Sequence, residues 1–250
     1  MRPSQTTEPP MEALIDQFGE DTLMLATGLG VGIIFGIAAF LSRFCLRAAT
    51  VEVADGKIGP KLAIWLTAFV TALLSVQMAI WLGALDVSDA RQLAATGSLS
   101  GAIIGGLMFG VGMVLARGCA SRLLVLSATG NLRAIVTGLV LTLTAQASLR
   151  GVLAPAREYL AALWTVQGGP DRQLISADSG LFPILVIGSA GILLAAMAFG
   201  LRRGLSRTEL VSASVVGLAV YGGWQMTYEI AQASFDIIAI QSVTFTGPST

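Results

Sequence analysis

The sequence predicts an all-α polytopic membrane protein with about six membrane-spanning helices, joined in places by short or re-entrant helices. Of its 250 residues, 54% are apolar and 12% are charged, and the mean hydropathy is +0.78. So few charges cannot cover a soluble surface, and several uncharged apolar runs come near the ~20 residues that cross a bilayer. A membrane β-barrel would instead show alternating polarity along each strand.

Six apolar runs give the predicted spans in chain order: Leu23–Leu41, Leu62–Leu85, Leu99–Ala116, Ala134–Leu149, Leu181–Leu201 and Leu210–Trp224. We place the helical transmembrane domain at residues 22–224, between an acidic segment at 1–21 and a junction segment at 225–250. The acidic segment lacks the basic start that a cleavable signal peptide needs.

Basic and acidic connections alternate between these runs. The basic connections hold Arg43, Arg47, Lys57 and Lys61, then Arg117, Arg122 and Arg133, then Arg202, Arg203 and Arg207. The acidic connections, besides the N-terminal segment, hold Asp86, Asp89, Glu158, Asp171 and Asp178. Because basic loops stay in the cytoplasm, we expect an extracytoplasmic N-terminus.

One phrase occurs twice in the chain and contains both of its cysteines. The first copy reads Phe35-Gly36 … Arg43-Phe44-Cys45, and the second reads Phe109-Gly110 … Arg117-Gly118-Cys119. Each copy closes an apolar run, so the internal repeat around Arg-x-Cys, near residues 28–60 and 102–134, is parallel rather than inverted. The expected topology puts both phrases toward the cytoplasmic ends of their helices.

Small residues line one face of the first helix in each copy. The rows are Gly28, Gly32 and Gly36 in the first copy and Gly101, Gly105, Gly106 and Gly110 in the second. Small residues four apart let helices approach closely in lipid. We therefore expect close packing of these helices to bring the two Arg-x-Cys phrases together.

The helical pattern breaks after the second phrase. The stretch Ser121–Ala128 is too short to span a bilayer, and Gly130-Asn131 signals a turn with Asn131 as the N-cap of the next helix. We expect a half-helix, an interfacial helix or a re-entrant segment here. A break at Gly118-Cys119 would face protein or a water-lined cavity, as at the substrate sites of many transporters.

Composition excludes several kinds of chemistry. The chain has no histidine, which excludes histidine-based catalytic pairs, haem or zinc ligation by histidine, and histidine proton relays. Its two cysteines lie far apart and form no Cys-x-x-Cys motif. We therefore expect no cofactor, no metal ion and no nucleic-acid partner.

The twin Arg-x-Cys phrases are the candidate functional residues. Topology explains arginines at helix ends and packing explains a buried cysteine, but neither explains why a cysteine follows each arginine. Guanidinium groups attract oxyanions, and a neutral thiol is a weak, polarisable donor from which an anion can leave again. We assign the substrate pathway to Cys119, Cys45, Gly118, Arg117, Arg122 and Arg43.

Several stretches resemble the YeeE/YedE-type sulfur-transport family. The most specific is Gly106-Leu-Met-Phe-Gly-Val-Gly-Met-Val-Leu-Ala-Arg-Gly-Cys-Ala-Ser-Arg-Leu, followed by Gly130-Asn-Leu-Arg. Arg43-Phe-Cys-Leu-Arg is similar to the family's first cysteine motif. Gly222-Gly-Trp-Gln and Gln241-Ser-Val-Thr-Phe-Thr-Gly-Pro-Ser are similar to its junction segment. The resemblance covers essentially the whole chain.

The resemblance implies a bacterial inner-membrane protein that is not an enzyme and that takes up thiosulfate or a related sulfur compound. It implies that Cys119 and Cys45 line the pore and contact the substrate. It also implies a second half with another Gly-Cys motif after Phe-Thr-Gly-Pro, so we expect this sequence to be a fragment.

Two other functions stay open. In one, a thiolate at Cys119 takes sulfane sulfur as a persulfide and passes it to a cytoplasmic sulfur-carrier protein, with Arg43 or Arg117 stabilising the thiolate. In the other, the chain is a structural subunit. Glu229 and Asp236 also have two interpretations, as functional carboxylates within the membrane or as residues of an extracytoplasmic loop.

Overall fold

The computed structural model describes residues 10–87, 90, 95–168, 180–234, 238 and 240–245. Helices make up nearly all of the regular structure in these ranges, which confirms the all-α class. A two-stranded antiparallel sheet pairs β1 (Gly97–Ser98) with β2 (Thr165–Val166). Asp236 and the acidic residues Glu8, Asp89, Asp171 and Asp178 lie outside the described ranges.

Each predicted span folds into one long helix. In chain order these are α2 (Glu20–Leu41), α4 (Pro60–Trp81), α6 (Leu99–Leu115), α8 (Leu132–Arg150), α10 (Phe182–Arg202) and α11 (Arg207–Ala233). Among the described residues, shorter helices accompany them: α1 (Pro10–Phe18), α3 (Leu46–Ala54), α7 (Ala120–Ala128) and α9 (Ala154–Ala162).

Five of the described helical segments, those formed by or beginning with α2, α4, α6, α8 and α10, are long and apolar enough to cross a membrane. The sixth predicted span, α11, is the longest helix at 27 residues but is not among these five. Polar side chains such as Gln225 and Glu229 lower its hydropathy. It packs against both α2 and α4, so protein rather than lipid covers much of its surface.

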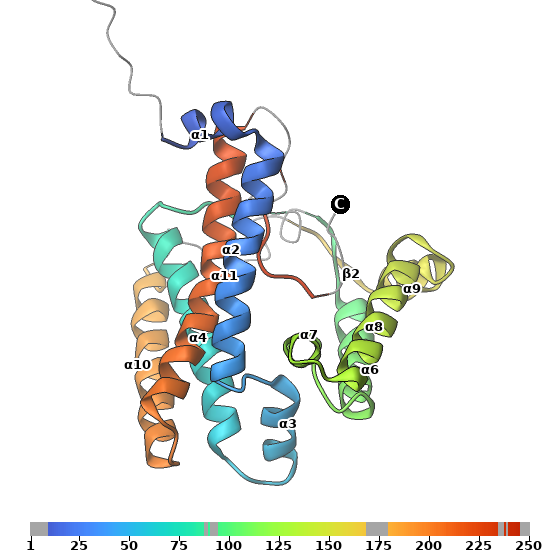
Figure 1. The fold of residues 1–250 in the computed structure, drawn as a ribbon, viewed down its shortest axis with the longest axis vertical. Coiled ribbons are helices and arrows are strands. Elements are labelled where there is room, and N and C mark those ends of the chain that lie inside the picture. The colour runs from blue at the N-terminus through green and yellow to red at the C-terminus, as the bar shows by residue number, and fades with distance from the viewer. Residues whose placement is uncertain are drawn as a thin grey trace, which may run out of the picture.

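The helices form two groups (Figure 1). One group contains α2, α4, α10 and α11, with α1 at one end and α3 at the other. The second contains α6, α8 and α9, and α7 lies between the two groups, where it contacts both α2 and α8. The outer faces of α6 and α8 expose large apolar side chains, among them Leu107, Leu115 and Leu143 at about 70% of their surface. Such faces suit contact with lipid.

At the starts of several helices, a side chain accepts hydrogen bonds from the first backbone N–H groups. Asn131 accepts from the N–H of Ala134 at 3.1 Å, which confirms it as the N-cap of α8. The α4 helix starts with Pro60, and the Glu52 carboxylate of α3 accepts from the next two N–H groups, at 3.2 and 3.0 Å. Ser206 and Glu209 form a capping box at the start of α11.

The internal repeat extends to whole elements. Each copy consists of a long helix, a four-residue turn and a nine-residue helix: α2 and α3 in the first copy, α6 and α7 in the second. Matching ends lie 74 positions apart, as do Cys45 and Cys119. Both long helices run downward in Figure 1 from their first residue to their last, so the copies are parallel.

The glycine rows do not pack as the sequence predicted. Cβ atoms added at the three row positions of α2, and at three of the four in α6, would meet no atom within 4 Å in the described structure. Only Gly101 faces a neighbour, the Ser98 and Ala161 side chains. The two Arg-x-Cys phrases are brought together instead by α7, which lies against the end of α2.

The α4 and α11 helices approach each other closely at Gly217. A Cβ at Gly217 of α11 would overlap the carbonyl oxygen of Ala68 and lie 2.8 Å from the Ala72 nitrogen and from Thr71 Cβ. Only a residue without a side chain fits against the α4 backbone at this point.

We expect Gly217→Ala to destabilise the protein by about 1–3 kcal/mol, because the added methyl group forces α4 and α11 apart. Gly191→Ala is the matched control, since a Cβ there meets nothing within 4 Å and alanine gains up to about 1 kcal/mol of helix propensity. Thermal unfolding of the two variants in detergent measures the difference. Equal melting temperatures would show that this contact does not limit stability.

Candidate functional site

The two Arg-x-Cys phrases form the same turn. The arginine directly after each C-cap has a left-handed backbone, with φ 54° at Arg43 and 55° at Arg117. The N–H of the following residue donates to the carbonyl five positions back, at 3.1 Å in both copies: Phe44 to Ala39 and Gly118 to Met113. This hydrogen bond marks a Schellman ending of a helix.

Arginine is an unfavourable residue for this turn. The left-handed conformation costs a residue with a Cβ about 1–2 kcal/mol, and glycine usually takes the position. Among the described residues, Arg43 and Arg117 are the non-glycine residues with positive φ. Both copies therefore keep an arginine side chain where backbone energetics favour glycine, as is common at functional sites.

Both cysteines stand at the N-cap of a short helix. Cys45 precedes α3, and Cys119 precedes α7. Serine, threonine, aspartate and asparagine are the usual N-cap residues because their oxygen accepts from the first free N–H groups. Here each thiol stands instead at the positive end of a helix dipole.

The two sulfur atoms are in contact. The Sγ of Cys119 lies 3.8 Å from the Sγ of Cys45 and 3.3 Å from the Ser121 hydroxyl. Both cysteines are free thiols; Cys119 is buried and Cys45 is half-buried. The repeat thus forms a thiol pair at the junction of the two helix groups.

Each sulfur interacts with backbone N–H groups from both copies of the repeat. The N–H groups of Ala48 and Cys119 interact with the Cys45 sulfur. Those of Arg122 and Leu46 interact with the Cys119 sulfur. Each sulfur therefore lies beside its own helix start and beside that of the other copy.

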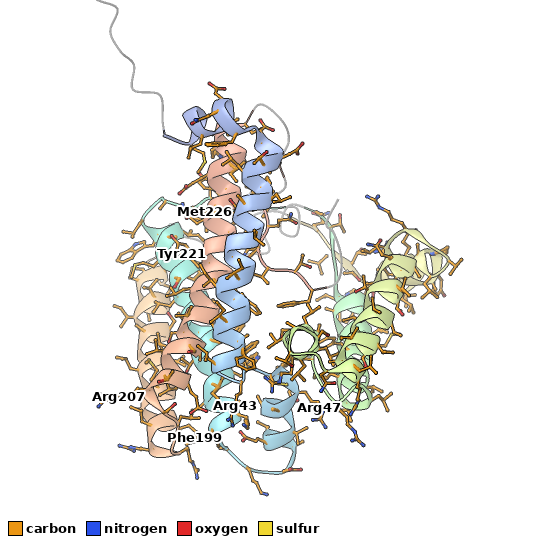
Figure 2. The ribbon with its side chains drawn as sticks, in the orientation of Figure 1. Arg43, Arg47, Phe199, Arg207, Tyr221 and Met226 are labelled. Carbon is orange, nitrogen blue, oxygen red and sulfur yellow. The ribbon has the colours of Figure 1, made fainter. Side chains whose placement is uncertain are left out.

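A cavity of about 560 Å³ lies next to Cys45. Five of its lining side chains are cationic: Arg43, Arg47, Lys61, Arg117 and Arg122. Figure 2 shows Arg43 and Arg47 where α2 meets α3, at the same end of the molecule as Arg207 and away from Tyr221 and Met226. The thiol pair and this cavity together form a strongly electropositive site.

Gly118, the remaining predicted pathway residue, is buried in the turn beside Cys119. A Cβ there would lie 3.1 Å from Leu123 Cδ2 and 3.2 Å from its Cγ. The structure therefore brings together all six predicted residues, with the arginines around the cavity and Gly118 close to the α7 side chain of Leu123.

A second cavity, of about 300 Å³, lies along the first half of α2. It is lined by that half of α2, by α11 and by residues 241–244, including Thr27, Thr227 and Gln241. Between it and the thiols lies an aromatic cluster, in which the Phe35 ring is 5.4 Å from Phe245 and 6.5 Å from Phe44, centroid to centroid.

Three features of the site were missed from sequence. Arg47 belongs to the phrase Arg43-Phe-Cys-Leu-Arg, so its spacing was a usable signal. Lys61 comes from the start of α4, and its place beside the thiols depends on tertiary structure. The contact of Ser121 with Cys119 is local and follows from the start of α7.

Glu229 lies apart from the cysteines on α11. Its carboxylate accepts a hydrogen bond of 3.0 Å from the Gln225 side chain, which also donates to the Ala84 carbonyl at 3.1 Å. The hydrogen bond to Ala84 ties α11 to the turn after α4, and the hydrogen bond within α11 gives the Glu229 carboxylate a structural partner.

Comparison with known proteins places this site in a family. A family model described as "Sulphur transport" matches residues 41–240, a range that contains both Arg-x-Cys phrases. The chain belongs to the sulphur-transport family. Over 230 residues it is 27% identical to "Thiosulfate transporter TsuA" of Spirochaeta thermophila, and this alignment covers 80% of the chain and 68% of that protein.

These matches confirm the resemblance that the cysteine motifs indicated. With the apolar helices, they make this member of the sulphur-transport family a multi-pass membrane protein and a transporter rather than an enzyme. They do not favour the persulfide-forming enzyme that the sequence had left open.

The contact between the sulfurs is directly testable. Mild oxidation of the full chain with diamide is expected to join Cys45 and Cys119 in an intramolecular disulfide, because their sulfurs lie 3.8 Å apart and both are free. Titration of the unfolded protein would then detect no free thiol. Cys45→Ser and Cys119→Ser, the controls, each keep their one thiol. Two titratable thiols in the oxidised wild type would contradict the geometry.

Proposed function

We propose that this protein takes up thiosulfate or a related sulfur-containing anion across the bacterial inner membrane and that the Cys45–Cys119 pair contacts it on the way. In this proposal the N-terminus is extracytoplasmic, and the cation-lined cavity opens toward the cytoplasm. The support comes from the alternation of basic and acidic connections and from the thiosulfate transporter with which the chain aligns.

The observation that carries the proposal is a thiol pair held among positive groups. Thiosulfate has a soft terminal sulfur and three charged oxygens. The terminal sulfur suits the weak, polarisable S–H donors of Cys45 and Cys119, whose sulfurs are 3.8 Å apart. The oxygens suit the guanidinium groups of the cavity.

Weak contacts favour passage over retention. A permeating ion must bind well enough to enter and still leave. A neutral thiol attracts the anion less strongly than an arginine would, and two thiols in contact allow the anion to move from one to the next. Placing the guanidinium groups around the cavity, beyond the thiols, keeps the strongest charges at the mouth.

The two cavities define a route along α2. It runs from the cavity at Met24–Gly32, past the Phe35 cluster, to the thiol pair and then to the cations. The aromatic rings occupy the route between the first cavity and the thiols, so passage requires them to move. A cytoplasmic sulfur-carrier protein is the proposed recipient at the cation-lined end.

Replacing the thiols tests this function. We expect Cys119→Ala to lower thiosulfate uptake into cells by more than about tenfold, because losing a hydrogen bond to a charged ligand costs about 1.5–3 kcal/mol. Cys45→Ala should have a similar effect, and Cys119→Ser, which keeps a donor but loses polarisability, should fall between. Uptake of radiolabelled thiosulfate, corrected for protein in the membrane, measures the effect.

Ser189→Ala is the matched control for this experiment. It also removes a buried donor, one that binds the Val186 carbonyl at 2.8 Å in α10, and should leave uptake unchanged. Unaltered uptake with both cysteines replaced would refute the thiol pathway. A lasting sulfur adduct on Cys119 by mass spectrometry would instead favour a persulfide mechanism.

The left-handed arginines allow stability and transport to be separated. Arg117→Gly relieves an unfavourable backbone conformation, so we expect unchanged or higher stability, by up to about 1 kcal/mol, together with weaker thiosulfate uptake. The melting temperature and the uptake rate of the same variant provide both readouts. If stability fell while uptake stayed normal, the arginine would serve folding rather than the anion.

A further inference from the structure

The cation-lined cavity contains more positive charge than the thiol pathway requires. Arg43, Arg117 and Arg122 belong to the proposed pathway, but Arg47 of α3 and Lys61 at the start of α4 also line the cavity. Arg47 follows Cys45 by two residues in the first copy of the repeat, and Lys61 comes from the start of the next helix. With Arg117 and Arg122 of the second copy, cations from both copies and from α4 converge on one cavity.

None of these five cations forms an ion pair with a carboxylate in the described part of the chain. The Glu52 carboxylate lies near Lys61 but accepts from the backbone N–H groups of Lys61 and Leu62. It caps α4 and leaves the ammonium group of Lys61 free to bind an anion.

Glu209 is the other carboxylate that these charges affect. It is half-exposed and accepts hydrogen bonds from the N–H and hydroxyl of Ser206, at 2.9 Å each. Arg43 and Lys61 act on it only through space. One carboxylate does not balance five cations, so the cavity keeps a large excess of positive charge.

Arg47 has an unused donor inside the protein. Its Nε is buried and has no hydrogen-bond partner. A buried N–H of a charged group is costly when it remains unpaired. An oxyanion in the cavity would satisfy this donor, and a guanidinium group matches the geometry of such oxygens.

We propose that Arg47 and Lys61, with Arg43, bind a tetrahedral oxyanion such as sulfate in the cavity beside Cys45, where the cationic groups and not the thiols hold it. The inference rests on the proposed function, because this site would be a second binding site on the same transport pathway. It recognises charged oxygens only, whereas the thiols recognise a terminal sulfur. Sulfate, which has no terminal sulfur, therefore occupies this site and competes there with thiosulfate.

Equilibrium binding of radiolabelled sulfate to the purified full chain, in phosphatidylcholine nanodiscs at fixed ionic strength, tests this site. Binding should be saturable, and Arg47→Gln and Lys61→Gln should each weaken it by about tenfold or more, since each removes a charged hydrogen bond. Arg207→Gln is the matched control: this exposed arginine lies at the same end of the molecule but outside the cavity lining. Melting temperatures show that each variant is folded.

Equal sulfate affinity in Arg47→Gln and wild type, or no saturable binding to folded wild type, would overturn the inference. Cys119→Ala separates it from the proposed function, because this variant should keep sulfate binding while losing thiosulfate uptake. If sulfate binding also disappears in Cys119→Ala, the thiols and the cations do not bind independently, and the inference fails. Normal uptake in Cys119→Ala, with Arg47-dependent sulfate binding intact, would refute only the thiol pathway.

The phosphate of an anionic lipid headgroup also presents charged oxygens that these cations could bind. The measurement is therefore repeated in nanodiscs that contain phosphatidylglycerol. Sulfate binding that persists there supports a site for a soluble oxyanion. Loss of sulfate binding in phosphatidylglycerol, with binding intact in phosphatidylcholine, would assign the cations to a lipid headgroup and overturn the proposal.

Discussion

The site depends on the meeting of two helix starts. The α3 and α7 helices both begin at a cysteine, and the two sulfurs are 3.8 Å apart. Two positive helix ends pointed at one place repel each other unless polarisable or negative groups lie between them. The thiols fill that place in the described structure. The surrounding arginines add positive charge rather than cancel it, so the arrangement attracts an anion.

The core around α11 holds this junction in place. The α11 helix packs so closely on α4 that Gly217 cannot have a side chain, and it also packs against α2. Phe35, near the end of α2, lies in the same apolar cluster as Val216 of α11, and Val125 of α7 packs against this cluster. The second copy of the repeat is therefore positioned against the first by contacts made through this cluster. Rigid support of this kind keeps two small thiols aligned.

Local sequence patterns predicted much of the fold, and the six residues assigned from sequence to a substrate pathway lie close together in the structure. Apolar runs marked all six long helices, Asn131 signalled the start of α8, and the shortness of Ser121–Ala128 indicated α7. The prediction that the glycine rows bring the two Arg-x-Cys phrases together was wrong. Glycines four residues apart show that a helix face can pack closely, but they do not show which helix packs against that face. The apolar run Leu210–Trp224 alone also made α11 look like the other spans, because the polar residues that lower the hydropathy of the whole helix follow that run.

The sequence by itself determined that the chain spans a membrane, that its two cysteines stand in equivalent places, and that arginines accompany them. These properties depend on residue type and short spacing, which act through local backbone and solvation energies. Only the tertiary structure decided that the two sulfurs touch, that Arg47 and Lys61 join the repeat arginines around one cavity, and that Phe35 stands before the thiols. Those contacts join residues of separate helices, and they depend on how α7 and α11 pack against α2.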